Sequence, residues 1–92
     1  MYATIRHYKN AGALQDAMTS KADEIQKLIS GVAGFVSYYA TRSDDEMTSI
    51  TVCNDKAGCD ETSRLAATWV RENVQSLPDA AEISGGDVFV DF

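Results

Sequence analysis

The stretch GFVSYYATRSDDEMTSITVCND, residues 34–55, predicts two β-strands joined by a tight acidic turn. Its apolar residues do not all fall on one side of the strands. Val36 and Tyr38 alternate on one side of the first strand, whereas Phe35 and Tyr39 alternate on the other. A sheet with one face in water shows apolar side chains on one side only, because successive side chains point to opposite faces. This hairpin therefore predicts a sheet whose two faces are both covered.

The segments on either side of the hairpin switch between strand and helix periods. Residues 2–8, YATIRHY, alternate and are rich in aromatic and β-branched residues, which indicates a strand. Residues 12–30 carry apolar residues at spacings of three and four, which predicts one helix ending at Gly31. The apolar stripe of a second helix, capped by Asp55, consists of Leu65, Ala66, Trp69, Val70 and Val74. The final residues, GGDVFVDF (85–92), predict a last strand.

The predicted order is strand, helix, strand, strand, helix, strand in a single domain, residues 1–92. Right-handed crossovers then give a four-stranded antiparallel sheet with both helices on one face, the ferredoxin-like βαββαβ fold of the α+β class. We expect the more apolar strand positions to face the helices, namely Ala3, Ile5, Val36, Tyr38, Ala40, Ile50, Val52, Val88 and Val90. The opposite set is Tyr2, Thr4, Arg6, Tyr8, Phe35, Ser37, Tyr39, Thr41, Ser49, Thr51, Cys53 and Phe89.

The charge of the chain excludes two classes of partner. The formal net charge is −6 at pH 7, and the eight Lys and Arg residues are scattered along the sequence. Nucleic acids and anionic membranes are bound through clustered basic residues, so we expect neither partner. There is no run of 18 apolar residues, and the strand-like start MYATIRHY does not resemble a secretion signal. We therefore expect a cytoplasmic protein.

The cysteines and acidic residues do not form a metal motif. Cys53 and Cys59 have no second pair, and His7 is the only histidine, so we expect free thiols and no metal site. Cys59 lies near the start of the second predicted helix, where it is either a nucleophile activated by the helix dipole or an inert small side chain. The acidic run at residues 44–46 is most simply a solvated turn.

Four segments resemble one protein family. They are MYATIRHY (1–8), GFVSYYA (34–40), SITVCNDKAGCDETSRLAATWVREN (49–73) and EISGGDVFV (82–90). Together they are similar to a small bacterial branch of the antibiotic biosynthesis monooxygenase group, whose members are dimeric α/β barrels. The superfamily also contains haem-degrading enzymes and isomerases. One departure is the sequence TSR at residues 62–64, where SNR would be expected, because it removes an asparagine amide.

The resemblance implies a cofactor-independent oxygenase that acts on a small phenolic or similarly electron-rich aromatic compound between helices and sheet. Three residues are predicted to point into that layer, and they are the candidate catalytic residues: His7, Tyr38 and Trp69. His7 would act as general base, while Tyr38 and Trp69 would position the ring. Each also has a structural alternative, as a hydrogen-bonded imidazole at the edge of the core, a buried hydroxyl or a core indole.

Two other functions remain open at this point. The first is a non-catalytic dimer that binds a metabolite or a protein partner, with the same cavity filled by side chains. The second is haem binding, for which His7 is the only available imidazole. Since the chain has no glycine-rich phosphate loop or dinucleotide fingerprint, we expect no nucleotide or flavin cofactor.

We expect a homodimer formed through the sheet face that carries no helices. The large side chains assigned to that face are Tyr2, Tyr8, Phe35, Tyr39, Met47 and Phe89. Leaving them in water would expose a larger apolar patch than soluble monomers usually tolerate. A two-fold axis pairs the patch with itself and leaves no copy exposed.

Overall fold

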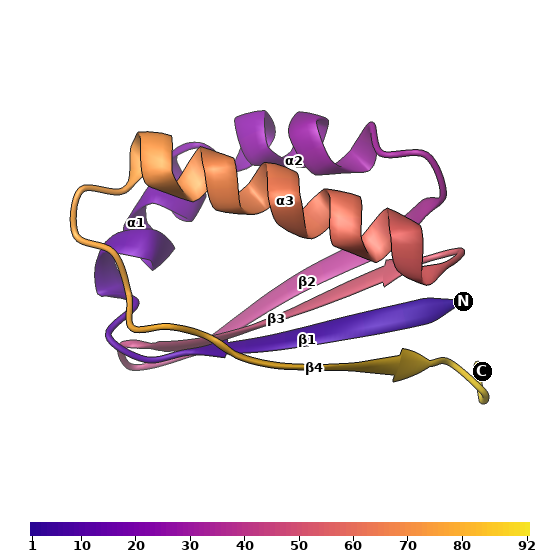
Figure 1. Ribbon diagram of the computed structural model, residues 1–92. Helices are drawn as coiled ribbons and strands as arrows, with labels where there is room; N and C mark the ends of the chain where they lie inside the picture. Colours follow the sequence, from indigo (N-terminus) through magenta and orange to yellow (C-terminus); the bar gives the residue numbers. More distant parts are fainter.

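The computed structural model describes residues 1–92 and contains four strands and three helices. In chain order they are β1 (Tyr2–Tyr8), α1 (Gly12–Ser20), α2 (Ala22–Ser30), β2 (Phe35–Ser43), β3 (Glu46–Cys53), α3 (Lys56–Asn73) and β4 (Glu82–Asp87). The strands form one antiparallel sheet in the order β2-β3-β1-β4, and the helices lie together on one face of it (Figure 1). This arrangement confirms the predicted ferredoxin-like fold.

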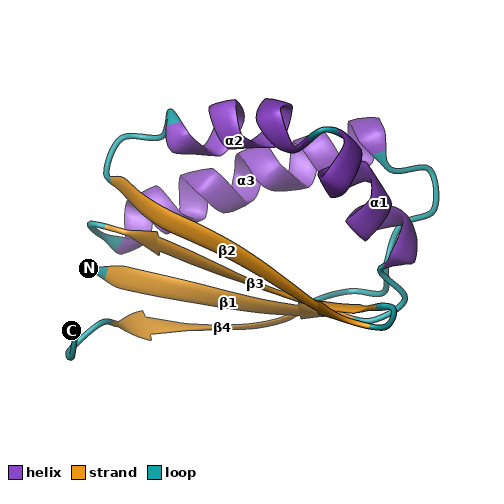
Figure 2. Cartoon of the chain, turned by 180° about the vertical axis from the view of Figure 1, so that it is seen from behind, coloured by secondary structure: helices purple, strands orange, loops and turns teal.

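The first helical region is two helices, so the prediction of one helix over residues 12–30 is wrong. Lys21 interrupts it with φ −121° and ψ 32°, outside the helical region. The interruption turns α1 toward the end of the sheet where β2 and β3 are joined, while α2 runs beside α3 (Figure 2). There the amide of Gln15 donates hydrogen bonds to the carbonyl oxygens of Asp44 and Glu46, each at 3.1 Å. Helix α1 is therefore positioned by the β2–β3 turn.

The last strand ends earlier than the sequence predicts. Strand β4 stops at Asp87, and the Val88 N–H donates to the carbonyl oxygen of Met1 at 2.9 Å. The final residues continue beyond the sheet, and the Phe89 side chain is 94% exposed. The expected strand over residues 85–92 is therefore wrong in its second half, and Val88, Phe89 and Val90 occupy no strand face.

The side chains of β1 and β3 point the opposite way from the prediction. The buried residues on these strands are Thr4, Met47, Ser49, Thr51 and Cys53, and Cys53 lies against Thr62 of α3. The apolar pairs Ala3–Val52 and Ile5–Ile50 share the other face, which no helix covers, and Ile5 remains 41% exposed. The more apolar side of these two strands therefore faces away from the helices.

Strand β2 changes face at an irregularity near its start. Phe35 pairs with Cys53, whereas Ser37 pairs with Val52, so the register shifts between Phe35 and Ser37. Phe35 consequently lies on the helix side and packs with Ile25, Ile29 and Trp69, contrary to the prediction. Beyond the shift, Tyr38 pairs with Thr51 on the helix side and Tyr39 pairs with Ile50 on the helix-free side, as predicted.

Helix α3 begins where the sequence places it. The Asp55 carboxylate accepts a hydrogen bond from the Gly58 N–H at 2.9 Å, which confirms the predicted cap. Cys53 and Cys59 are free thiols and fully buried, and the Cys59 thiol donates to the carbonyl oxygen of Tyr2 at 3.4 Å. Burial at this position favours the reading of Cys59 as a packing group over that of an accessible nucleophile. None of the three helices has the length and apolar character to cross a membrane.

Candidate functional site

A cavity of about 440 Å³ lies between the helices and the sheet, and it is called the central cavity below. Its sheet side is formed by alternate residues of β1 and β3 with Tyr38 of β2, and its helix side by α3 with parts of α1 and α2. The lining also includes residues between 77 and 83, a largely exposed segment that connects α3 to β4 and begins that strand. The volume falls within the range of ligand pockets, roughly 300–1,000 Å³.

The cavity wall has an apolar part and a polar part. The apolar part includes Leu14, Met18, Ile25, Ile29, Met47 and Trp69. The polar part, from the sheet, includes Arg6, Tyr8, Tyr38, Ser49 and Thr51. Because these strand residues line a cavity and not a tightly packed core, polar side chains are tolerated on the helix side of the sheet. This explains why the more polar parity of β1 and β3 faces the helices.

Arg6 lies on β1, a strand paired on both edges, and its side chain reaches the central cavity. The two Lys and Arg ion pairs of the structure join other residues, Lys56 with Asp60 and Arg64 with Glu61, and Glu46 is hydrogen-bonded to His7. No side-chain hydrogen bond of the structure involves Arg6. A guanidinium carries five N–H donors, so Arg6 offers the cavity a cation that no protein carboxylate neutralises.

Two tyrosine hydroxyls lie close enough to Arg6 to interact with its charge. Burial raises the pKa of Tyr8, and the Arg6 cation offsets part of the rise. Burial also raises the pKa of Tyr38, the neighbouring Tyr8 adds to this, and Ser49 and Arg6 oppose it. Both phenols therefore keep their protons at neutral pH and can donate hydrogen bonds into the cavity.

Trp69 contributes an apolar wall in a fixed orientation. The residue is 4% exposed and packs with Ile25 and Ile29. Its indole Nε1–H donates to the Glu24 carboxylate at 2.9 Å, so the one polar atom of the ring is engaged by α2. The indole therefore offers the cavity its carbon surface and no donor. Tyr38 and Trp69 both line the cavity, as predicted.

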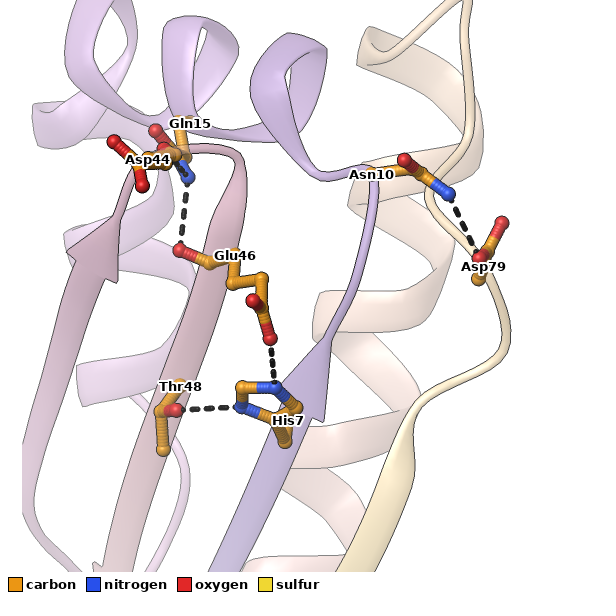
Figure 3. A network of polar contacts seen from close by, with 7 residues as sticks. All are labelled: His7, Asn10, Gln15, Asp44, Glu46, Thr48 and Asp79. Carbon is orange, nitrogen blue, oxygen red and sulfur yellow. Dashed lines mark hydrogen bonds and ion pairs between the residues drawn. The ribbon is translucent and has the colours of Figure 1, made fainter.

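His7 is on the other side of the sheet, and the prediction that it meets Tyr38 and Trp69 is wrong. Its Nε2 lies 2.7 Å from a carboxylate oxygen of Glu46, and its Nδ1 lies 2.9 Å from the Thr48 hydroxyl (Figure 3). The error follows from the reversed orientation of β1, since His7 shares a face with Ala3 and Ile5. With both ring nitrogens engaged on the helix-free face, His7 is neither a base nor a haem ligand for the central cavity.

Sequence reasoning missed Arg6, Tyr8 and Ser49 as cavity residues and assigned them to the helix-free face. The alternation of polar residues along β1 and β3 is equally typical of a strand face in water, so it did not distinguish the face that borders the cavity. No group of three or more His, Cys, Asp or Glu side chains is placed to hold a metal ion.

Comparison with known proteins finds similarity in structure alone. No family model and no curated protein matches the sequence. Among solved structures, SnoaB, a cofactor-independent oxygenase from Streptomyces nogalater, superposes with a TM-score of 0.68 at 15% identity over 98% of this chain and 94% of that one.

Two further structures are similar over nearly the whole chain. MhuD, a haem degrader from Mycobacterium tuberculosis solved with two haems in its active site, gives a TM-score of 0.69 at 12% identity over 100% of this chain and 99% of that one. A protein described as an antibiotic biosynthesis monooxygenase gives 0.63 at 12% identity over 98% of this chain and all of the other. The chain therefore shares the ferredoxin-like fold of antibiotic biosynthesis monooxygenases, as the resemblance in its sequence implied.

Proposed function

We propose that this protein binds a small phenolic compound in the central cavity and oxygenates it without a cofactor. The observation that carries the proposal is the composition of the cavity wall, which sets the Trp69 ring and aliphatic side chains near an unpaired Arg6 and two protonated tyrosines. A phenol needs an apolar surface for its ring and hydrogen-bond donors for its oxygen. The fold shared with a cofactor-independent oxygenase supports the same reading.

In this reaction the substrate supplies the electrons. The cavity lining contains no imidazole, and in this proposal the phenol loses its proton to water. The phenolate oxygen is stabilised by Arg6 and the tyrosine hydroxyls, and the ring passes one electron to O₂. The resulting radical and superoxide combine at the para ring carbon to form a peroxide anion, which takes a proton back from water and loses water to leave a carbonyl. One phenol with a free para position and one O₂ thus give one quinone and one water, with no external reductant.

Oxygen uptake by purified protein, treated with a chelator, tests the proposal with a panel of phenols and hydroquinones. We expect saturable uptake without added metal, flavin or nicotinamide. For a phenol with a free para position, isotope-labelled O₂ should deliver one labelled atom to the quinone and one to water. Tyr38→Phe, which removes one hydroxyl donor to a charged oxygen, should lower kcat/KM by roughly 10-fold to 100-fold.

Tyr39→Phe, on the helix-free face, is the matched control and should leave turnover unchanged. Uptake that begins only when flavin is supplied would contradict the cofactor-free reaction. Binding of phenols without any uptake would instead assign the cavity to a non-catalytic binding protein, the competing function.

We also propose that the protein is a homodimer formed through the helix-free face of the sheet. The apolar side chains on that face are Ala3, Ile5, Tyr39, Ile50 and Val52. Ile5 is 41% and Tyr39 is 63% exposed. Full burial of the four larger side chains stabilises by at most about 6–12 kcal/mol. Since association costs about 4–15 kcal/mol, other contacts must contribute as well.

The cytoplasmic location stays a prediction.

A further inference from the structure

The central cavity has a charge opposite to that of the molecule. The chain carries a formal net charge of −6, yet the charged residues that line the cavity are Arg6, Arg71 and Asp79. One carboxylate oxygen of Asp79 already accepts a hydrogen bond from the Asn10 amide at 2.8 Å (Figure 3). Arg71 is exposed and lies on the last turn of α3, whereas Arg6 is half-buried on the sheet. The inner part of the cavity therefore carries one uncompensated positive charge.

The polar groups around Arg6 are suited to an oxyanion. A guanidinium only donates hydrogen bonds, and Tyr8 and Tyr38 keep their protons at neutral pH, so each can donate as well. No carboxylate of the protein is paired with Arg6 to accept these bonds. A half-buried cation without a partner is costly, because part of its hydration is lost without compensation. A planar oxyanion, such as a carboxylate or phenolate, would supply the acceptors that the site lacks.

The apolar part of the same cavity fits the rest of such a ligand. Trp69, Ile25 and Ile29 form one packed cluster, and all three line the cavity. The indole nitrogen is occupied by Glu24, so the ring presents only apolar surface there. An aromatic ring buried against this surface gains the hydrophobic contribution, while its charged end meets the donors on the sheet.

We propose that the central cavity selects the ionised form of an acidic aromatic compound, with the oxyanion bound by Arg6 and the ring placed on the wall that contains Trp69. This inference deepens the proposed function because it uses the same cavity. It is nevertheless independent of turnover, since selection of an anion can be measured in the absence of any reaction.

The test uses 4-nitrophenol, whose acid and anion differ in colour. We expect the pKa of the bound phenol to lie about one unit below that of the free phenol, which corresponds to a tenfold preference for the anion. Calorimetry with a second pair of probes supplies an independent measure, and 4-nitrobenzoate should bind at least tenfold more tightly than the neutral 4-nitrobenzamide.

Three variants identify the residue responsible. Arg6→Gln should abolish both preferences while the neutral amide still binds, and Arg6→Lys should restore part of them because it restores the charge. Arg64→Gln, which removes an exposed charge of α3 outside the cavity lining, is the matched control and should retain them. Equal binding of the two nitrobenzoyl probes to the unmodified protein, or an unshifted pKa of bound 4-nitrophenol, would overturn the inference. Selection of anions with no oxygen uptake from any phenol would refute only the oxygenase. Turnover of phenols without any preference for the anion would refute the inference and the role of Arg6 in stabilising the phenolate, but not the oxygenase activity.

Discussion

Tyr8 and Tyr38 make the stability of the fold depend on pH in the alkaline range. Both phenols have pKa values raised by burial above the ordinary value of 10.0. The folded state therefore holds these protons more tightly than the unfolded state does. The resulting stability is fully present below the ordinary pKa and is lost as the pH rises through the raised pKa of the folded protein.

We expect the free energy of unfolding to fall above about pH 10 and to fall less steeply in Tyr38→Phe, which has one buried phenol fewer. Urea unfolding at a series of alkaline pH values measures both slopes. Tyr39→Phe is the control, because Tyr39 is 63% exposed. Equal slopes for Tyr38→Phe and Tyr39→Phe would contradict the assignment of the dependence to the buried phenol.

Asp55 and His7 show how far the role of a single residue can be interpreted from sequence. Asp55 was predicted as a helix cap because capping depends on neighbours only three residues away, and the structure confirms it. The partners of His7 are Glu46 and Thr48, about forty residues along the chain, so no local pattern connects them. Its position on the helix-free face depended on the orientation of the whole strand. A residue role set by distant contacts is not readable from spacing alone.

At the scale of elements, the packing of α3 on β3 depends on a glycine. A methyl group at Gly58 would lie 3.0 Å from the Cβ of Cys53 and 3.3 Å from the carbonyl oxygen of Ala33. Neither atom belongs to the flexible end of a side chain, so the helix would have to move away from the strand. Asparagine, serine or alanine usually suits a helix better than glycine, but each is disfavoured here by these close contacts.

We expect Gly58→Ala to lower the free energy of unfolding by about 1–2 kcal/mol, because overpacking costs more than the gain of up to about 1 kcal/mol in helix propensity. Gly12→Ala is the matched control, since nothing lies within 4 Å of a methyl group at that helical glycine. Its stability should stay the same or rise. Urea unfolding of both variants measures the difference, and a stabilised Gly58→Ala would show that α3 is free to shift on the sheet.

The elements that sequence periodicity missed were altered by tertiary contacts. The apolar spacing over residues 12–30 is continuous, and Lys21 is not a helix-breaking residue. The interruption accompanies the Gln15 contacts to the β2–β3 turn and the Lys21 hydrogen bond to Asn73 of α3, at 2.7 Å. The register shift near Phe35 is not predicted by any sequence pattern either, because the segments on both sides of it have the pattern of a strand.

For the whole molecule, the helix-free face predicts how the chain associates. An aspartate at position 39 would place a charge among Ile5 and Ile50 if two sheets pack together, and burying an unpaired charge is strongly unfavourable. We therefore expect the unmodified protein to have twice the mass of one chain by light scattering at micromolar concentration, and Tyr39→Asp to be monomeric or unfolded.

Ala57→Asp adds the same charge on the exposed surface of α3 and should remain dimeric. A single-chain mass for the unmodified protein would refute the dimer. Circular dichroism of Tyr39→Asp distinguishes loss of association from loss of folding, and a folded dimeric Tyr39→Asp would place the interface elsewhere on the surface.

The overall fold was predictable because the alternation of periods two and 3.6 specifies element order, and element order with right-handed crossovers leaves few topologies. Which side of each strand faces the helices was not predictable. The rule that the more apolar face meets the helices assumes that the helices cover the face of the sheet most completely removed from water. Here Arg6, Tyr8 and Ser49 line a cavity, while Ile5, Ile50 and Val52 lie on the opposite face.

The position of Arg6 on β1 has a consequence for how this protein can diversify. Strand β1 is hydrogen-bonded on both edges, so the backbone that carries the guanidinium tolerates few changes. Part of the cavity lining, in contrast, comes from the chain between Leu77 and Ala81, which belongs to no helix or strand. Substitutions and insertions are tolerated best in such connections. Sequence changes in this connection can therefore alter the shape of ligand that the cavity accepts, while the preference for an anion stays the same.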